Sequence, residues 1–202
     1  MTEELKVWIG VDPGGKDNFG LAIMKADGSS HTWCVDHADA AIDIVRTYLS
    51  STPAGAGVDA PLWWSSGRSS DRHADRWLRT RYGFTSGQVQ TSNSLRGAAL
   101  VQAAMFVQRL REAYPAVPVT EVHPKALLRA IAENSWEIFS SRYQVNSTHA
   151  TEHERDSIVA AVAAREGFEG RWTHDLASKR LPSEQDPRSY WLAPIYYYWP
   201  EQ

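Results

Sequence analysis

The sequence predicts an α/β fold in which a five-stranded mixed sheet is flanked by helices. Five short apolar runs have the length and composition of strands, and amphipathic segments of helical length separate the later ones. The expected order is three strands, then helix, strand, helix, strand and two further helices. Short connections make strands one to three antiparallel, whereas right-handed crossovers make strands one, four and five parallel.

The first three strands are expected at residues 5–11, 19–24 and 31–35. The first run is apolar except for Lys6, which is typical of a strand buried on both faces, and DPGG at 12–15 ends it in a turn. The sequence ADGSS at 26–30 separates the second and third runs, and its Asp-Gly step favours a hairpin. These three runs therefore form an antiparallel unit at the start of the chain.

The later elements follow from helical spacing and from the residues that interrupt it. Ile42, Val45 and Leu49 lie at helical spacing, and a Ser/Thr/Pro/Gly-rich segment then leads to a fourth strand around GVDAP at 57–61. An alanine-rich stripe predicts a long helix at 95–111, and Pro124 suits the first turn of the helix that follows the fifth strand. A Ser/Asn/Thr-rich stretch at 144–151 is expected to be a mobile loop. The predicted helices and the fifth strand lie at 38–49, 95–111, 117–122 (strand), 124–132 and 152–165.

Composition favours one intracellular domain. A chain of 202 residues that is 43% hydrophobic can form a core without disulfides, so we expect a single domain over 1–202, with a core at about 5–166 and an aromatic C-terminal extension at 167–202. Cys34 is the only cysteine, which suits a reducing compartment. No apolar run approaches the length of a membrane span, and the start of the chain does not resemble a signal peptide. We therefore expect a cytoplasmic protein with no membrane partner.

Three acidic residues stand at the ends of the three parallel strands. Asp12 follows the first strand, Asp59 the fourth and Glu121 the fifth. Parallel strands place their carboxyl ends at one edge of the sheet, where open α/β folds gather ligands and catalytic groups. The simpler alternative is that these residues are turn acids without a shared role.

The last predicted helix brings further polar groups to the same edge. Asp156 shares a helix face with Glu152 at i−4 and with His153 at i−3. Carboxylates brought close together repel one another until a proton or a cation neutralises them, and Mg²⁺ or Mn²⁺ is the usual cation where phosphate is the substrate. The alternative is a set of surface charges on a solvated helix.

Motifs near both ends of the predicted domain have counterparts in a known group of enzymes. IGVDPG at 9–14, FGLA at 19–22 and HERDS at 153–157 resemble the first two strands and the last helix of the Holliday-junction resolvase branch of the ribonuclease H-like nucleases. GVDAP at 57–61, residues 72–76, EVHP at 121–124 and HERDSIVAAVAA at 153–164 are similar to a large family of uncharacterised, predicted ribonuclease H-like nucleases. The resemblance covers most of residues 5–166 and implies a ribonuclease H-like fold.

The resolvase pattern implies that Asp12, Asp59 and Asp156 bind two divalent ions, with His153 near the metals or the scissile phosphate. Glu121 belongs only to the pattern of the uncharacterised family. Resolvases usually carry glutamate where this chain has Asp59, and the formal net charge of -3 lacks the basic character of a junction-binding protein. The resemblance therefore implies metal-dependent hydrolysis without assigning a branched substrate.

Two further features have both a functional and a structural interpretation. Arg72 and Arg76 are four residues apart, so on a helix they would present guanidinium groups to a substrate phosphate, or else pair with neighbouring aspartates on a solvated face. Trp63, Trp64 and the aromatics at 190–199 would suit stacking on bases. We favour their packing at the edge of the core, because large aromatics bury much apolar area.

The leading hypothesis is a metal-dependent phosphodiester hydrolase that acts on DNA or RNA. One alternative is a phosphoryl-transfer enzyme related to the actin-like ATPases and sugar kinases, although those proteins duplicate the domain and 202 residues leave no room for that. The other is a non-catalytic domain of the same fold that binds nucleic acid or protein. The sequence does not determine the oligomeric state, for which a homodimer is one alternative. The candidate groups are catalytic Asp12, Asp59, Glu121, His153 and Asp156; metal-binding Asp12, Asp59, Glu152 and Asp156, for Mg²⁺ or Mn²⁺; and phosphate-binding Arg72 and Arg76.

Overall fold

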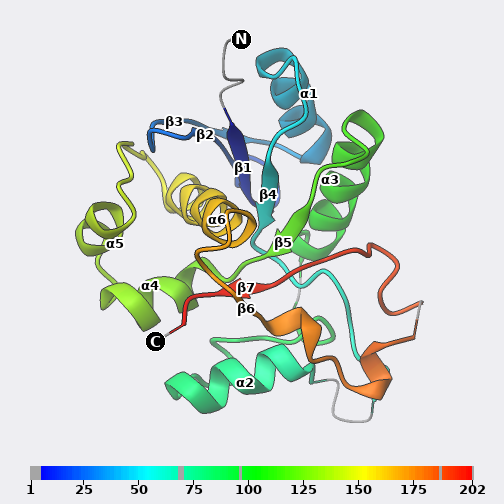
Figure 1. Cartoon of the computed structure of the whole chain (residues 1–202). Helices are drawn as coiled ribbons and strands as arrows, with labels where there is room; N and C mark the ends of the chain where they lie inside the picture. Colours follow the sequence, from blue (N-terminus) through cyan, green and yellow to red (C-terminus); the bar gives the residue numbers. More distant parts are fainter. Residues whose placement is uncertain (1–5, 68–70, 96, 187, 202) are drawn as a thin grey trace.

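The computed structural model describes residues 6–67, 71–95, 97–186 and 188–201 (Figure 1). Leu5 and Arg96, which belong to the predicted first strand and to the predicted helix at 95–111, lie outside the described residues. The strands are β1 Val7–Asp12, β2 Phe19–Lys25, β3 Ser30–Val35, β4 Gly55–Val58, β5 Val119–Glu121, β6 His174–Asp175 and β7 Tyr198–Trp199. The α-helices are α1 Ala38–Tyr48, α2 His73–Tyr82, α3 Ala99–Ala113, α4 Pro124–Ala132, α5 Trp136–Arg142 and α6 Glu152–Phe168, and short 3-10 turns lie at Leu176–Ser178 and Pro182–Glu184.

The main sheet has five strands in the order β3-β2-β1-β4-β5. The pairs β1–β2 and β2–β3 are antiparallel, whereas β1–β4 and β4–β5 are parallel. This order and these directions are the topology of the ribonuclease H-like fold, so the predicted fold class is confirmed. The carboxyl ends of β1, β4 and β5 consequently lie at the same edge of the sheet.

Helices cover both faces of this sheet. Helices α1 and α3 lie on one side, and α6 lies across β1, β2 and β4 on the other, with α4 and α5 beside it (Figure 1). Glycines let α6 approach closely: a Cβ atom on Gly10 would lie 1.9 Å from the Ser157 carbonyl oxygen, and one on Gly57 would lie 2.0 Å from that of Ala160. Because the helix backbone touches the strands, the second and third turns of α6 are held against β1 and β4.

The C-terminal segment 169–201 packs against the edge of β5. The Tyr196 amide donates to the Val119 carbonyl (3.0 Å), and the Glu121 amide donates to the Tyr196 carbonyl (2.8 Å). β7 pairs with β6 in a small second sheet, and Tyr197 and Trp199 are buried. The expectation that the aromatics close the core is confirmed for these two residues and for Trp63. Trp191, by contrast, has 51% of its surface exposed.

Three features differ from the sequence prediction or add to it. Helix α5 and the two short strands β6 and β7 were not predicted, and α2 formed in a stretch where a helix was considered without being placed in the predicted order. The expected mobile loop at 144–151 is tied to the β2–β3 turn, because Ser30 donates to Ser147 (2.7 Å) and the Asn146 amide donates to the Gly28 carbonyl (3.0 Å). Within the described ranges, no helix is both long and apolar enough to cross a membrane.

Candidate metal centre

Three aspartates from three different elements meet at the edge of the sheet. Asp12 ends β1, Asp59 directly follows β4, and Asp156 lies in the second turn of α6. Each offers a carboxylate oxygen, and the three oxygens lie within 4.8 Å of one another. The structure therefore brings together the three acids on which the sequence-based hypothesis depends, while their roles stay a prediction.

The strand register explains how the two strand acids come side by side. Val11 pairs with Val58 across the parallel β1–β4 ladder, and the Asp59 amide donates to the Val11 carbonyl (2.9 Å). Asp12 and Asp59 each follow that pair by one residue, so their side chains emerge on the same face of the sheet. Gly10, which contacts the α6 backbone, precedes Asp12 by two residues and therefore lies on the same face of the sheet. This is the face that α6 covers, and α6 carries Asp156.

Burial makes this cluster unfavourable for negative charge. Burial raises the pKa of Asp12 to about 6, partly offset by a hydrogen bond from His153, and the nearby Asp156 charge raises it further. Burial and the charges of Asp12 and Asp156 hold the pKa of Asp59 well above its usual range. Burial also raises the pKa of Asp156, against the opposing effect of Arg155. A bound cation would relieve this repulsion in place of protons.

Two of the aspartates keep one oxygen available for such a cation. His153 Nδ1 lies 2.7 Å from Asp12 Oδ2, and Arg155 donates to Asp156 Oδ1 from Nε (2.9 Å) and Nη2 (2.7 Å). In the described part of the chain, Asp12 Oδ1 and Asp156 Oδ2 take no hydrogen bond. These two oxygens and the carboxylate of Asp59 are the groups that could hold a cation.

Glu152 has a different partner from the one its predicted metal role requires. Its carboxylate lies 2.7 Å from Lys125 Nζ and 3.5 Å from Arg155 Nη2, and it is outside the group of acids close enough to share a cation. Its role as a ligand stays a prediction. Lys125 was missed in the sequence because a lone lysine in the first turn of a predicted helix carries no distinctive signal. It brings positive charge to the edge of the cluster.

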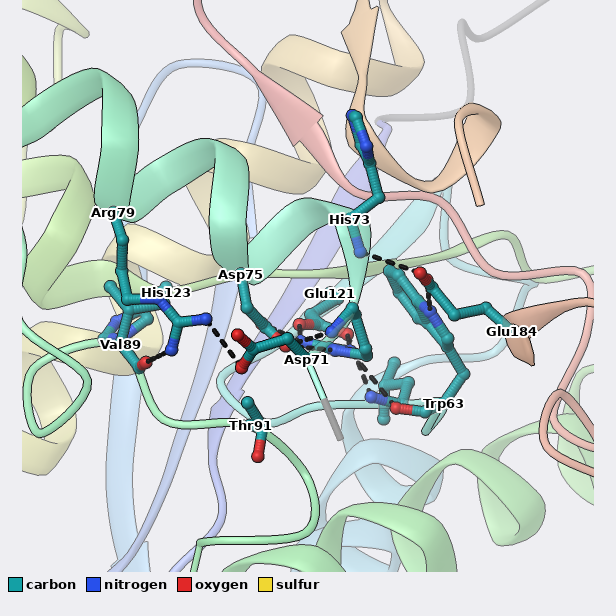
Figure 2. Close-up of polar contacts among 12 residues, drawn as sticks. Trp63, Asp71, His73, Asp75, Arg79, Val89, Thr91, Glu121, His123 and Glu184 are labelled. Carbon is teal, nitrogen blue, oxygen red and sulfur yellow. Dashed lines mark hydrogen bonds and ion pairs between the residues drawn. The ribbon is translucent and has the colours of Figure 1, made fainter. Parts of the chain in front are cut away.

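Arg72 lies in a buried ion-pair cluster with Asp75 and Glu121, two residues that are labelled in Figure 2. With 1% of its surface exposed, it donates to Asp75 from Nε (2.9 Å) and Nη2 (2.7 Å) and to Glu121 from Nη1 (2.8 Å) and Nη2 (2.6 Å). Nη1 also donates to the Trp63 carbonyl (3.3 Å). Because all five N–H donors are engaged, none is left for a substrate phosphate. In this structure Arg72 holds the loop after Asp59 through the Trp63 carbonyl, and its predicted phosphate contact stays a prediction. Arg76 is exposed on α2, and its phosphate contact stays a prediction.

Glu121 joins this ion-pair cluster because of a one-residue difference in register. Glu121 pairs with Val58, whereas Asp59 follows Val58, so the side chains of Glu121 and Asp59 point to opposite faces of the sheet. Both oxygens of Glu121 accept from Arg72, and Oε2 also accepts from the Leu62 amide (2.9 Å). Glu121 therefore lies outside the group of three aspartates, and its predicted catalytic role stays a prediction.

A pocket of about 310 Å³ opens beside the three aspartates. Its wall includes Gln88 and Gln90 from the loop before α3, and His123 and Lys125 after β5. His123 was not singled out in the sequence, although EVHP places it two residues after Glu121, at the carboxyl edge of the sheet. The three aspartates thus border a cavity large enough for a small ligand.

Among the solved structures that are similar to this chain are two of Thermus thermophilus RuvC. Thermus thermophilus RuvC in complex with a Holliday-junction substrate is 15% identical, with a TM-score of 0.49 over 87% of this chain and 99% of that chain. A second Thermus thermophilus RuvC structure is 16% identical, with a TM-score of 0.44 over 82% of this chain and 95% of that chain. The sheet topology, rather than these similarities, defines the fold. No curated protein matches the chain.

A family model described as "Protein of unknown function (DUF429)" matches residues 10–186. The match includes Asp12, Asp59 and Asp156, together with the ion-pair cluster around Arg72 and Glu121. It agrees with the resemblance to an uncharacterised family that the sequence motifs indicated. The chain therefore belongs to the DUF429 family.

Proposed function

We propose that this protein is a divalent-metal-dependent phosphodiester hydrolase that acts on nucleic acid. The observation that carries the proposal is the meeting of Asp12, Asp59 and Asp156 within 4.8 Å at the carboxyl edge of a ribonuclease H-like sheet. Carboxylate oxygens are the ligands that Mg²⁺ and Mn²⁺ prefer in proteins. The raised pKa of each aspartate supports the fit, because a cation compensates charge that burial otherwise makes unfavourable.

The chain's own groups have distinct tasks in this proposal. Asp12, Asp59 and Asp156 would hold Mg²⁺ or Mn²⁺, which supplies Lewis-acid stabilisation to phosphate oxygens. His153 fixes the orientation of Asp12 through Nδ1, and its second ring nitrogen, on a partly exposed side chain, can exchange a proton with substrate or solvent. Lys125 lines the pocket and brings a positive charge toward an incoming phosphate.

Metal binding is tested before any substrate is chosen. Mn²⁺ is titrated by calorimetry into the native protein, into Asp12→Asn and into Asp43→Asn, a control at an exposed aspartate on α1. We expect binding by the native protein and by the control, and none by Asp12→Asn. Cleavage of single-stranded, duplex and branched DNA and RNA in Mn²⁺ then tests hydrolysis, with Asp12→Asn as the inactive reference. Absence of Mn²⁺ binding both with and without nucleic acid would contradict the proposal and favour a non-catalytic domain.

A further inference from the structure

One residue that lines the pocket beside the three aspartates carries a buried hydrogen-bond acceptor that no described residue satisfies. His123 lines this pocket together with the three aspartates. Its Nε2 atom lies 2.9 Å from the Gln88 carbonyl oxygen, which can only accept. Nδ1 is buried and has no hydrogen-bond partner among the residues that the structure describes. The ring is therefore fixed at one nitrogen and unpaired at the other.

The protonation of the ring follows from these contacts. Burial lowers the pKa of His123, so the imidazole is neutral near pH 7. Since Nε2 must carry the proton that it donates to Gln88, Nδ1 carries a lone pair and acts as an acceptor. A buried acceptor left unpaired is unfavourable, and native proteins contain few of them. A ligand that offers an N–H or O–H donor would satisfy it.

The rest of the pocket indicates which ligand this is. Gln88 and Gln90 offer polar groups, Leu95 and Val122 offer apolar contact, and Lys125 adds positive charge. A nucleotide has the matching parts: polar base edges, apolar base faces and a phosphate. The volume of about 310 Å³ is at the lower end of ligand pockets, which suits one nucleotide and is too small for a base pair.

We propose that this pocket receives one unpaired nucleotide of the substrate strand, and that His123 Nδ1 accepts a hydrogen bond from a donor on that nucleotide. The inference rests on the proposed function, because the three aspartates of the same pocket would face the adjoining phosphate. It narrows the substrate class to single-stranded nucleic acid, or to a nucleotide extruded from a duplex.

Two substitutions of His123 separate ligand binding from a structural role. In His123→Asn, the side-chain oxygen can replace Nδ1 as the acceptor, but the contact to the Gln88 carbonyl is lost. In His123→Gln, the amide nitrogen can replace Nε2 as the donor to Gln88, but the acceptor at Nδ1 is lost. The proposal predicts that Asn substitutes for histidine and Gln does not. A purely structural role of the Gln88 contact predicts the reverse order.

The measurement is the fluorescence anisotropy of a labelled mixed-sequence oligonucleotide, as a single strand and as a blunt duplex, with Ca²⁺ in place of Mn²⁺. We expect the native protein to bind the single strand at least about tenfold more tightly than the duplex. A duplex either leaves His123 Nδ1 without its donor or must open a base pair to supply one, and both cost binding free energy. His123→Gln should weaken single-strand binding about fivefold to tenfold, and His123→Asn about twofold or less. Native-like binding by His123→Gln, or equal native affinity for the duplex, would overturn the inference.

Two further measurements show which of the two proposals fails, if either does. Tighter binding of a free nucleoside monophosphate than of the strand would overturn the strand as the source of the nucleotide. Mn²⁺ calorimetry on the same preparations tests the proposed function separately. If the native protein binds Mn²⁺ but no single strand, this inference alone fails. If it binds a single strand with the expected His123 dependence but no Mn²⁺, the proposed hydrolysis fails and the nucleotide pocket stands.

Discussion

Asp12 links the charge of the three-aspartate cluster to the stability of the fold. Burial raises its pKa from 3.8 to about 6 in the folded protein, whereas in the unfolded chain it titrates near its usual value. Between about pH 4 and pH 6 the folded state thus holds a proton that the unfolded state has released. Stability from this group is present below pH 4 and is lost as the pH rises through 6, in the absence of metal.

Asp12→Asn should therefore flatten the pH dependence of stability. One pKa unit corresponds to about 1.4 kcal/mol, so a shift of about two units amounts to at most about 3 kcal/mol at pH 7. We expect the free energy of unfolding of the native protein in EDTA to fall between pH 4 and pH 7, and that of Asp12→Asn to fall less. Urea denaturation at four pH values, with Asp43→Asn as the control, measures the difference. Equal slopes for the native protein and Asp12→Asn would show that Asp12 is not destabilised by burial.

Arg72 should be a stability residue, in contrast to its neighbour on the next helical turn. Arg72→Met leaves Glu121 and Asp75 buried without their cation, and breaking a buried ion pair in this way typically costs about 3–5 kcal/mol. Arg76→Ala, at an exposed position of α2, should change stability by less than about 0.5 kcal/mol. Chemical denaturation at pH 7 compares the two. A loss of similar size in both variants would mean that the cluster in Figure 2 does not stabilise the fold.

At the scale of secondary structure, the sequence signals were strong where burial fixes the pattern. The apolar run of β1 and the Asp-Gly hairpin between β2 and β3 are local signals, and the crossover rule then orders the sheet. Register is not local, which is why Glu121 was grouped with Asp12 and Asp59. Helix α5 has only seven residues, too few to show a clear period. β6 and β7 have two residues each and exist through tertiary pairing.

The close contact of α6 with the strands can be used to test how these elements position the three aspartates. Gly10→Ala and Gly57→Ala would each place a Cβ atom within about 2 Å of an α6 backbone carbonyl oxygen. We expect a loss of about 1–3 kcal/mol or more, as in other overpacked sites, and weaker Mn²⁺ binding because Asp156 moves with the helix. Gly15→Ala is the matched control, because nothing lies within 4 Å of a Cβ atom there. Thermal unfolding and Mn²⁺ calorimetry would both have to be unchanged in Gly10→Ala to contradict this account.

At the scale of the whole molecule, the C-terminal segment connects distant parts of the chain. Glu184 accepts a hydrogen bond from the Trp63 indole (3.0 Å) and from the His73 amide at the start of α2 (2.8 Å). Trp63 in turn lies in the loop that follows Asp59, with Arg72 stacked 4.3 Å from its ring. The segment that the sequence analysis treated as an extension thus supports the loop that carries one of the three aspartates.

Two tryptophans of this segment test whether it folds together with the sheet. Trp199 is fully buried and donates from Nε1 to the Tyr82 hydroxyl (2.7 Å), whereas Trp191 is 51% exposed. Replacing a buried tryptophan by alanine typically costs about 3–5 kcal/mol, so we expect Trp199→Ala to lower the melting temperature sharply in one transition. Trp191→Ala should cost less than about 1 kcal/mol, since little of its packing is lost. If Trp199→Ala instead melts in two steps and its Mn²⁺ binding is intact after the first, the segment is a separate unit and the loop after Asp59 holds its shape without it.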